Sequence, residues 1–156
     1  MSTGHFDALG GVRMVDVGDK DTTRRTALAQ GALSITQKQA DPLARGVVAK
    51  GDWKTTAQLA GIQGAKKCWE LIPLCHPLPI EQIEVDVRLD EPERRVHVTA
   101  RVSATAKTGV EMEAMCAVSA ALLAVYDMIK GIDKAARIES IELMTKSGGK
   151  SGDWKR

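Results

Sequence analysis

Apolar and polar residues alternate strictly in two neighbouring segments of the chain. Aliphatic side chains occupy every second position of residues 82–90, with polar residues between them, and residues 95–103 repeat the pattern. Successive side chains of a strand point to opposite faces, so each segment predicts a half-buried strand. Residues 91–93, which include a proline, are typical of a turn. Residues 82–103 therefore predict a β-hairpin.

A helical spacing of apolar residues follows Asp52 and continues to about Leu71. Asp52 is a suitable N-cap, because its carboxylate can accept hydrogen bonds from the first free amides of a helix. Gly61 and Gly64 weaken an isolated helix, but they would let another backbone pack closely against it. The segment predicts a helix over residues 52–71.

A second helix is predicted from Thr108 to about Lys130, with Gly131 beyond its end. The side chains of Thr108 and Glu111 match a capping box. Between residues 114 and 128 the segment is apolar almost all the way round. Such a helix is buried on more than one side, and in a small domain the second side would meet another subunit.

The remaining elements are shorter or weaker. Residues 26–35 predict a first strand, although Ala and Gly are weak strand formers, and residues 36–44 predict a short helix. Residues 138–143 predict a last strand. Residues 1–22 are expected to be an irregular arm, and residues 146–156 a flexible basic tail.

The long elements follow the order strand, helix, strand, strand, helix, strand. This βαββαβ order predicts an α+β, ferredoxin-like fold, with an antiparallel sheet and helices packed on one face. A chain of 156 residues is expected to form a single domain, 1–156, with a core of its own.

Composition narrows the function classes. The net charge of +2 does not indicate a nucleic-acid binder. The three cysteines lack a C-x-x-C spacing, which argues against a disulfide framework or a zinc ribbon and fits a reducing compartment. Residues 1–16 contain no apolar run typical of a signal peptide, and the longest apolar run, 114–125, is too short to span a bilayer. We therefore expect a cytoplasmic protein with no membrane partner.

The segment L-I-P-L-C-H-P-L-P, residues 71–79, places three prolines around Cys75 and His76. Prolines stiffen a loop and remove amide donors, so this connection presents His76 rigidly. His76 could be a general acid or base, an anion ligand, or a packed loop histidine. Because adjacent side chains of an extended segment point opposite ways, a Cys75–His76 nucleophilic dyad is not expected.

Asp127 and Lys130 lie three residues apart, hence on one face at the end of the second helix. They could form an acid/base pair with shifted pKa values, or Lys130 could simply compensate the helix dipole. Glu111 would be occupied by the capping box, and Glu113 is favoured near a helix N-terminus in any case.

Basic residues in loops and at element ends could converge on a polyanion, or they could be solvated surface charges. They are Lys20, Arg24, Arg25, Lys50, Lys66, Lys67, Lys130, Lys146 and Lys150. The segment Gly149-Lys150-Ser151 is not a Walker A site, because Met144 occupies the position of the required earlier glycine.

Together these segments closely resemble the molybdenum cofactor biosynthesis protein C family, the cyclic pyranopterin monophosphate synthases. The resemblance covers nearly the whole chain. Its most specific motifs are L-I-P-L-C-H-P-L at 71–78, K-T-G-V-E-M-E-A at 107–114 and K-S-G-G-K-S-G-D at 146–153. Shorter matches are M-V-D-V at 14–17, K-G-D at 50–52, A-G-I-Q at 60–63 and Y-D-M at 126–128.

The resemblance implies conversion of a 3′,8-cyclised dihydro-GTP to cyclic pyranopterin monophosphate, with release of diphosphate. It implies a homohexamer, a trimer of dimers, with active sites at subunit interfaces. It also implies no redox cofactor and no resident metal, although a Mg²⁺ ion could accompany the triphosphate.

Site residues follow from the resemblance, position by position. The catalytic residues it implies are Asp127, Lys50, Lys130 and His76. The substrate-binding residues are Leu74, Cys75, His76, Glu111, Met112, Glu113, Lys20, Arg25, Lys66 and Lys146. Proton transfers on the purine-derived ring call for groups such as Asp127 and His76, and expulsion of diphosphate calls for fixed cations.

Two other functions share this predicted fold. An RNA-recognition domain would stack bases on sheet aromatics, but residues 82–90 and 95–103 contain none. A non-catalytic, ligand-binding regulatory module would not need the pair Asp127 and Lys130. Fold alone does not separate a module from an enzyme, so the site must decide.

Overall fold

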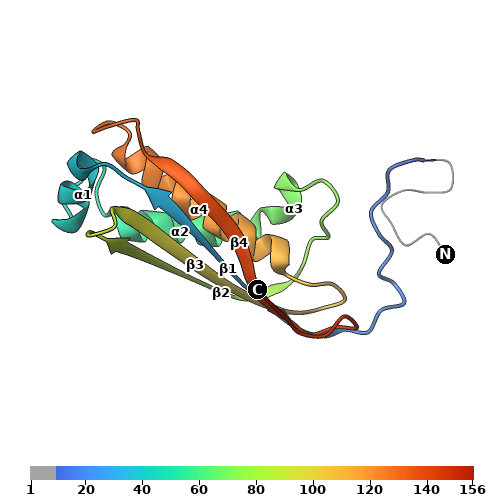
Figure 1. Cartoon of the computed structure of the whole chain (residues 1–156). Helices are drawn as coiled ribbons and strands as arrows, with labels where there is room; N and C mark the ends of the chain where they lie inside the picture. The colour runs from blue at the N-terminus through green and yellow to red at the C-terminus, as the bar shows by residue number, and fades with distance from the viewer. Residues whose placement is uncertain (1–9) are drawn as a thin grey trace.

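The structure is a computed structural model that describes residues 10–156. Its sheet has the strand order β2-β3-β1-β4-β5, and every neighbouring pair is antiparallel. The helices α2 and α4 pack on one face of this sheet (Figure 1). The elements are β1 (Thr23–Ser34), α1 (Gln37–Ala44), α2 (Trp53–Lys66), α3 (Cys68–Leu71), β2 (Ile80–Asp90), β3 (Arg95–Ala106), α4 (Glu111–Ile129), β4 (Arg137–Ser147) and β5 (Trp154–Lys155).

The predicted α+β, ferredoxin-like fold is confirmed. The hairpin of β2 and β3 and the long helix α4 lie where the apolar patterns predict them. Residues 10–22, the described part of the predicted arm, form no helix or strand. The rest of that arm, residues 1–9, lies outside the described residues.

The core lies between the sheet and the two helices. Every second residue of β3 is buried on this face, as Val98 and Val102 illustrate. Small residues on β1 bring α4 close to the sheet, since a Cβ on Gly31 would lie 2.7 Å from Val118 Cγ1. The helix therefore packs almost directly onto the backbone of the central strand.

The predicted helix over 52–71 is interrupted at Lys67, whose backbone leaves the helical region with φ −102° and ψ 9°. The chain continues in α3, a single turn, before the proline-rich loop. The break turns Cys68 inward, where it is 1% exposed. The predicted N-cap is confirmed, because Asp52 Oδ1 accepts hydrogen bonds from the amides of Lys54 and Thr55 at 3.0 and 3.2 Å.

The predicted capping box at Thr108 is wrong. Helix α4 begins at Glu111 with Val110 as its N-cap, and no side chain caps it. Glu111 is thus the first residue of the helix, too early to reach back as the third residue of a capping box does. Its carboxylate instead folds against Gly109, where an added Cβ would lie 1.9 Å from Oε2.

The C-terminal segment is more regular than the sequence predicts. β4 (Arg137–Ser147) begins one residue before the predicted 138–143 and ends four residues after it, because the long β1 pairs with it from Thr26 to Ser34. Residues 154–155, predicted to lie in a flexible tail, form the short strand β5 against β4. The turn between these two strands is consequently folded back toward β1.

Among the described residues, α4 is the one helix with the length and composition to cross a membrane. In the fold it lies against α2 and the sheet, and its residues Ala117, Ala121, Leu122 and Val125 are fully buried. These contacts are those of a core helix.

Candidate active site

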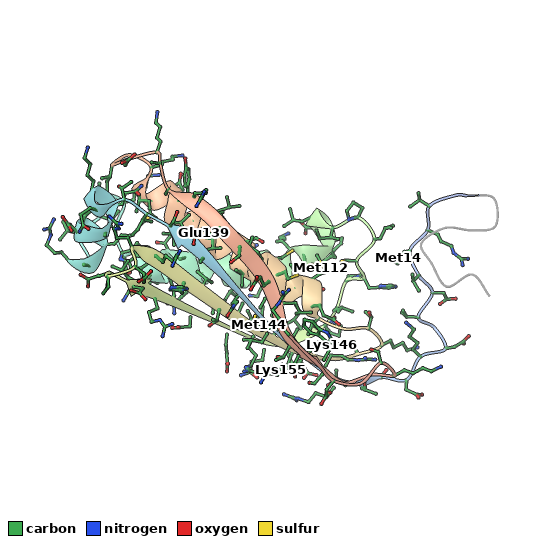
Figure 2. The ribbon with its side chains drawn as sticks, in the orientation of Figure 1. Met14, Met112, Glu139, Met144, Lys146 and Lys155 are labelled. Carbon is green, nitrogen blue, oxygen red and sulfur yellow. The ribbon has the colours of Figure 1, made fainter. Side chains whose placement is uncertain are left out.

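A cavity of about 970 Å³ opens at the N-terminal end of α4. The start of β1, the connection from β3 to α4 and the turn between β4 and β5 meet there. Lys146 and Met112 lie toward this same end of the molecule, opposite Glu139 (Figure 2). The cavity is lined by Asp19, Lys20, Asp21, Thr23, Arg25, Lys107, Thr108, Gly109, Glu111, Lys146, Gly149, Lys150 and Ser151.

Strand register brings the predicted cations together. Arg25 lies opposite Ala104 in the β1–β3 ladder, and Ala27 lies opposite Lys146 in the β1–β4 ladder. Directly opposed residues share a face, and Ala27 is buried under the helices, so Arg25 and Lys146 both project to the helix side of the sheet. Lys20 reaches the same space from the segment before β1.

Arg25 is the most buried of these cations, at 9% exposure. Its Nε donates to the carbonyl oxygen of Ala106 at 3.3 Å, and Nη2 donates to that of Lys107 at 3.4 Å. It forms no ion pair with any other described residue. A buried charge without a counter-ion is costly, so this guanidinium favours an anion in the cavity.

Lys107 is a cavity residue that the sequence analysis did not single out. Its Nζ donates to the carbonyl oxygen of Gly18 at 2.5 Å and so ties the segment before β1 to the β3–α4 connection. Asp19, Asp21 and Thr108 were likewise not assigned to the site. The K-T-G-V-E-M-E-A motif contains Lys107 and Thr108 and was the signal that could have identified them.

A second cluster lies at the opposite end of α4. Lys50 Nζ lies 2.6 Å from Asp127 Oδ2 and donates to the Asp127 carbonyl oxygen at 2.9 Å. Lys130 Nζ lies 2.7 Å from Asp127 Oδ1. Hydrogen bonds from Lys130 and then Lys50 lower the pKa of Asp127 to about 2, and Asp127 in turn raises the pKa of Lys130. Near neutral pH Asp127 is therefore a carboxylate that holds two ammonium groups side by side.

The proline-rich loop lies beside the first turn of α4, because α3 packs on that helix (Figure 1). His76 Nε2 lies 2.9 Å from the carbonyl oxygen of Val15, which ties the loop to the N-terminal arm. Leu74 and Cys75 are half-buried, and Met112 is 36% exposed. The structure thus brings the predicted segments 74–76 and 112–113 to one end of the helix.

Glu113 is a buried acid in this region, at 4% exposure. Burial raises its pKa, and the charge of Glu111 adds to the effect. Burial also raises the pKa of the Cys75 thiol, with a further contribution from the charge of Glu113. Both side chains consequently favour their neutral forms, and Glu113 is suited to hold a proton.

Lys66 is the predicted site residue that stands apart. It lies at the end of α2, beside a smaller cavity of about 310 Å³ lined by Ile62, Leu78 and residues 80–83. Lys66 does not line the larger cavity that contains Arg25, and no other predicted cation lines the smaller one. Within one chain Lys66 therefore does not join the other basic residues.

The two main clusters are far apart in a single chain. Glu111 lines the cavity, and Asp127 follows it by sixteen residues on the same helix. At 1.5 Å per residue this places their backbones about 24 Å apart. This distance exceeds the width of a typical small-molecule pocket, so one chain does not bring all predicted catalytic and binding residues to one substrate.

No metal centre is evident in the part of the chain that the structure describes. Within residues 10–156 no group of three or more His, Cys, Asp or Glu side chains is arranged to hold a metal ion. The three cysteines are free thiols, and Cys68 and Cys116 are buried.

Comparison with known proteins places the chain in a family. The model of the MoaC family matches residues 14–149. A protein of Thermomicrobium roseum named cyclic pyranopterin monophosphate synthase is 47% identical over 152 residues, 97% of this chain and 92% of its own length. Proteins of the same name from Roseiflexus castenholzii and a Nocardioides species are each 50% identical, over 96% and 97% of this chain and 94% of their own lengths. The chain therefore belongs to the MoaC family.

Proposed function

We propose that this chain is a cyclic pyranopterin monophosphate synthase of molybdenum cofactor biosynthesis, a lyase-type enzyme. Its substrate would be (8S)-3′,8-cyclo-7,8-dihydroguanosine 5′-triphosphate, and its products cyclic pyranopterin monophosphate and diphosphate. The name of the relatives supports this reaction. The observation that carries it is the buried Arg25, without a carboxylate partner, in a cavity that it shares with four lysines.

The cation cavity suits the phosphate end of the substrate. In the proposed step a substrate hydroxyl attacks the α-phosphorus, the bond from that phosphorus to the β-phosphate oxygen breaks, and diphosphate leaves. The leaving group gains negative charge as the bond breaks. Fixed cations such as Arg25, Lys20 and Lys146 stabilise that charge in the transition state more than in the substrate.

Rearrangement of the guanine-derived ring requires proton transfers. With its lowered pKa, Asp127 is ionised and acts by holding Lys50 and Lys130, whose ammonium groups can donate protons. Glu113, with its pKa raised by burial, can carry a proton at a pH where an ordinary glutamate cannot. His76 is a further acid or base, and its loop lies with Glu113 at the N-terminal end of α4.

We infer that the complete site forms between subunits. A second copy that brings its Lys50, Asp127 and Lys130 to the cation cavity would assemble a full set of groups. A homohexamer built as a trimer of dimers fits this requirement. The 59% exposure of Leu123, on the face of α4 away from the core, is compatible with a further contact between subunits.

No redox cofactor is needed, because the proposed reaction changes no overall oxidation state. A Mg²⁺ ion could accompany the triphosphate, held mainly by phosphate oxygens and water. We place the enzyme in the cytoplasm, without nucleic-acid or membrane partners.

The direct test is diphosphate release from the purified, cyclised substrate. The wild type should release diphosphate, and Asp127→Asn should reduce the rate by about 10²- to 10⁴-fold, the usual range for a group that supports proton transfer. Thermal unfolding of both proteins serves as the control. Because Asp127 lies at an exposed position, the variant should remain folded.

A folded wild type that leaves the intact substrate unchanged would contradict the proposal. The chain would then be a ligand-binding module of the same fold. Equal rates for the wild type and the variant would retain the reaction and remove Asp127 from its mechanism.

A further inference from the structure

Gly149 lies directly against the guanidinium of Arg25. A Cβ built on Gly149 would lie 1.5 Å from Arg25 Nη1 and 2.4 Å from Cζ. These positions cannot both be occupied, so any residue other than glycine must push the guanidinium away. No carbonyl or carboxylate of the described residues is hydrogen-bonded to Nη1, whereas Nε and Nη2 each have a carbonyl partner.

The neighbouring glycines of this turn differ in what surrounds them. A Cβ on Gly148 would lie 2.1 Å from the backbone oxygen of Arg24, so a side chain there would force β1 and the turn apart. A Cβ on Gly152 would meet nothing within 4 Å. All three residues have positive φ, +89° at Gly148, +81° at Gly149 and +64° at Gly152, so each is strained by substitution.

The collision at Gly149 involves the far end of a flexible side chain. An arginine side chain can rotate out of the way, so the fold can tolerate the change. The consequence is that the guanidinium is displaced from its position in the cavity. At Gly149 the need for glycine therefore concerns the cavity, whereas at Gly148 it concerns the docking of the backbone.

We propose that Gly149 is a positioning residue, which leaves room for the Arg25 guanidinium to face the phosphate groups bound in the cavity. Two backbone carbonyls hold Arg25 from the β3 side, and Gly149 sets its limit on the β4 side. This inference rests on the proposed function, because the phosphates of the substrate are the anions for which Arg25 would be held.

The test uses inorganic triphosphate as a probe, measured by calorimetry on the full chain, so it does not depend on turnover. Gly149→Ala and Arg25→Ala should each weaken binding by about 10- to 100-fold, the effect of losing one hydrogen bond to a charged group. Gly152→Ala is the matched control, because it adds the same methyl group at positive φ but does not line the cavity. It should bind the probe as the wild type does.

A double variant separates positioning from a general effect. Arg25→Ala with Gly149→Ala should bind no more weakly than Arg25→Ala alone, because the methyl group then has no guanidinium to displace. With the cyclised substrate, Gly149→Ala should lower kcat as well as raise KM, because Arg25 both binds the phosphates and stabilises the charge on the leaving diphosphate. If Gly149→Ala fails to fold, adding Arg25→Ala should restore folding by vacating the space.

The inference is overturned if Gly149→Ala binds the probe like Gly152→Ala, or if its effect adds fully to that of Arg25→Ala. Failure of Arg25→Ala to rescue an unfolded Gly149→Ala would overturn it too. So would a wild type that does not bind triphosphate. Probe binding as expected, together with no diphosphate release from the cyclised substrate, would refute the proposed reaction and retain the positioning of Arg25.

Discussion

Asp127 couples folding to pH through its two lysine partners. Its pKa is held at about 2 in the folded chain, below the ordinary value of 3.8. A carboxyl with a lowered folded pKa stabilises the fold above its unfolded pKa, and this contribution is lost as the pH falls through the folded pKa. Asp127→Asn should therefore unfold at a slightly lower temperature than the wild type near pH 7. The difference should narrow between about pH 4 and pH 2.

Thermal unfolding of both proteins across this pH range checks the expectation. The effect is small because the side chains are about half exposed and screened by water. A difference that stays constant down to pH 2 would mean that the amide acts through something other than the carboxylate charge.

Glu113 should show the opposite dependence. Burial raises its pKa above the ordinary value of 4.5, so the folded state disfavours the charged form. The contribution of such a group is complete below the unfolded pKa and is lost as the pH rises through the folded pKa. Glu113→Gln, which is neutral and of similar shape, should raise the unfolding temperature near pH 7, and this gain should disappear toward pH 4.

The same variant should lose activity if Glu113 carries a proton in the reaction. Glu91→Gln, in the exposed turn between β2 and β3, makes the same charge change and should alter neither property. A Glu113→Gln protein less stable than the wild type near pH 7 would contradict the inference that the buried carboxylate opposes folding.

Residue types at the site were largely predictable, but their partners were not. Asp127 and Lys130 are three positions apart on one helix, so their contact follows from helix geometry alone. Lys50 is 77 positions from Asp127, and only tertiary packing brings its Nζ to the carboxylate. The capping box predicted for Glu111 was wrong because the helix begins two residues later than the motif requires. That late start leaves the Glu111 carboxylate at the cavity.

At the scale of elements, the contact between α2 and α4 depends on glycine. A Cβ on Gly64 would lie 2.6 Å from Ala120 Cβ and 2.7 Å from the Cys116 carbonyl oxygen. The two helix backbones thus approach more closely at Gly64 than side chains would permit. The presence of Gly61 and Gly64 in this helix predicts such an approach.

Gly64→Ala should destabilise the protein even though alanine is the better helix former. The intrinsic gain from alanine is about 1 kcal/mol, whereas overpacking of a tight contact costs about 1–3 kcal/mol. Because the blocking atoms include backbone, we expect the steric cost to prevail, with a net loss of about 1 kcal/mol. Urea unfolding measures it.

Gly61→Ala is the graded comparison. Its Cβ would lie 3.1 Å from the Ala117 carbonyl oxygen and from both methyl groups of Val85, a contact that small shifts can relieve. It should therefore cost less than Gly64→Ala. A Gly64→Ala protein as stable as the wild type would show that the helices can separate without loss.

The periodic elements were predictable because burial of one face dictates their pattern. The alternation in β2 and β3 and the apolar run of α4 each satisfy this rule. The break at Lys67 was not predictable in this way, because the apolar spacing continues across it into α3. Likewise β5 is only two residues long, and its pairing with β4 depends on the turn before it. The glycines of that turn predict a flexible tail rather than a strand.

At the scale of the whole molecule, the chain separates its functional groups along α4. Figure 1 shows this helix running from the end near α3 to the end near α1. The cation cavity lies at the first end and the Asp127 cluster at the other. If both act on one substrate, each must come from a different subunit, and a defect in one cluster can be complemented by a subunit defective in the other.

Mixed subunits test this arrangement. Lys50→Ala removes a group from the Asp127 cluster, and Lys146→Ala removes one from the cavity, so each protein alone should release little diphosphate. When the two are co-expressed in equal amounts, half of the pairs are mixed, and one of the two sites in each mixed pair has both clusters intact. Activity should therefore return to about a quarter of the wild-type value.

The control mixes two variants of the same cluster, Lys50→Ala and Asp127→Asn. Every site between subunits then carries one defect or the other, so no pairing can restore activity. If the first mixture stays inactive while its subunits assemble, the complete site must lie within one chain. One substrate would then have to reach both ends of α4. Equal recovery in both mixtures would point to mutual stabilisation of the subunits. Recovery in the first mixture alone is expected only when the cavity of one chain faces the Asp127 cluster of another.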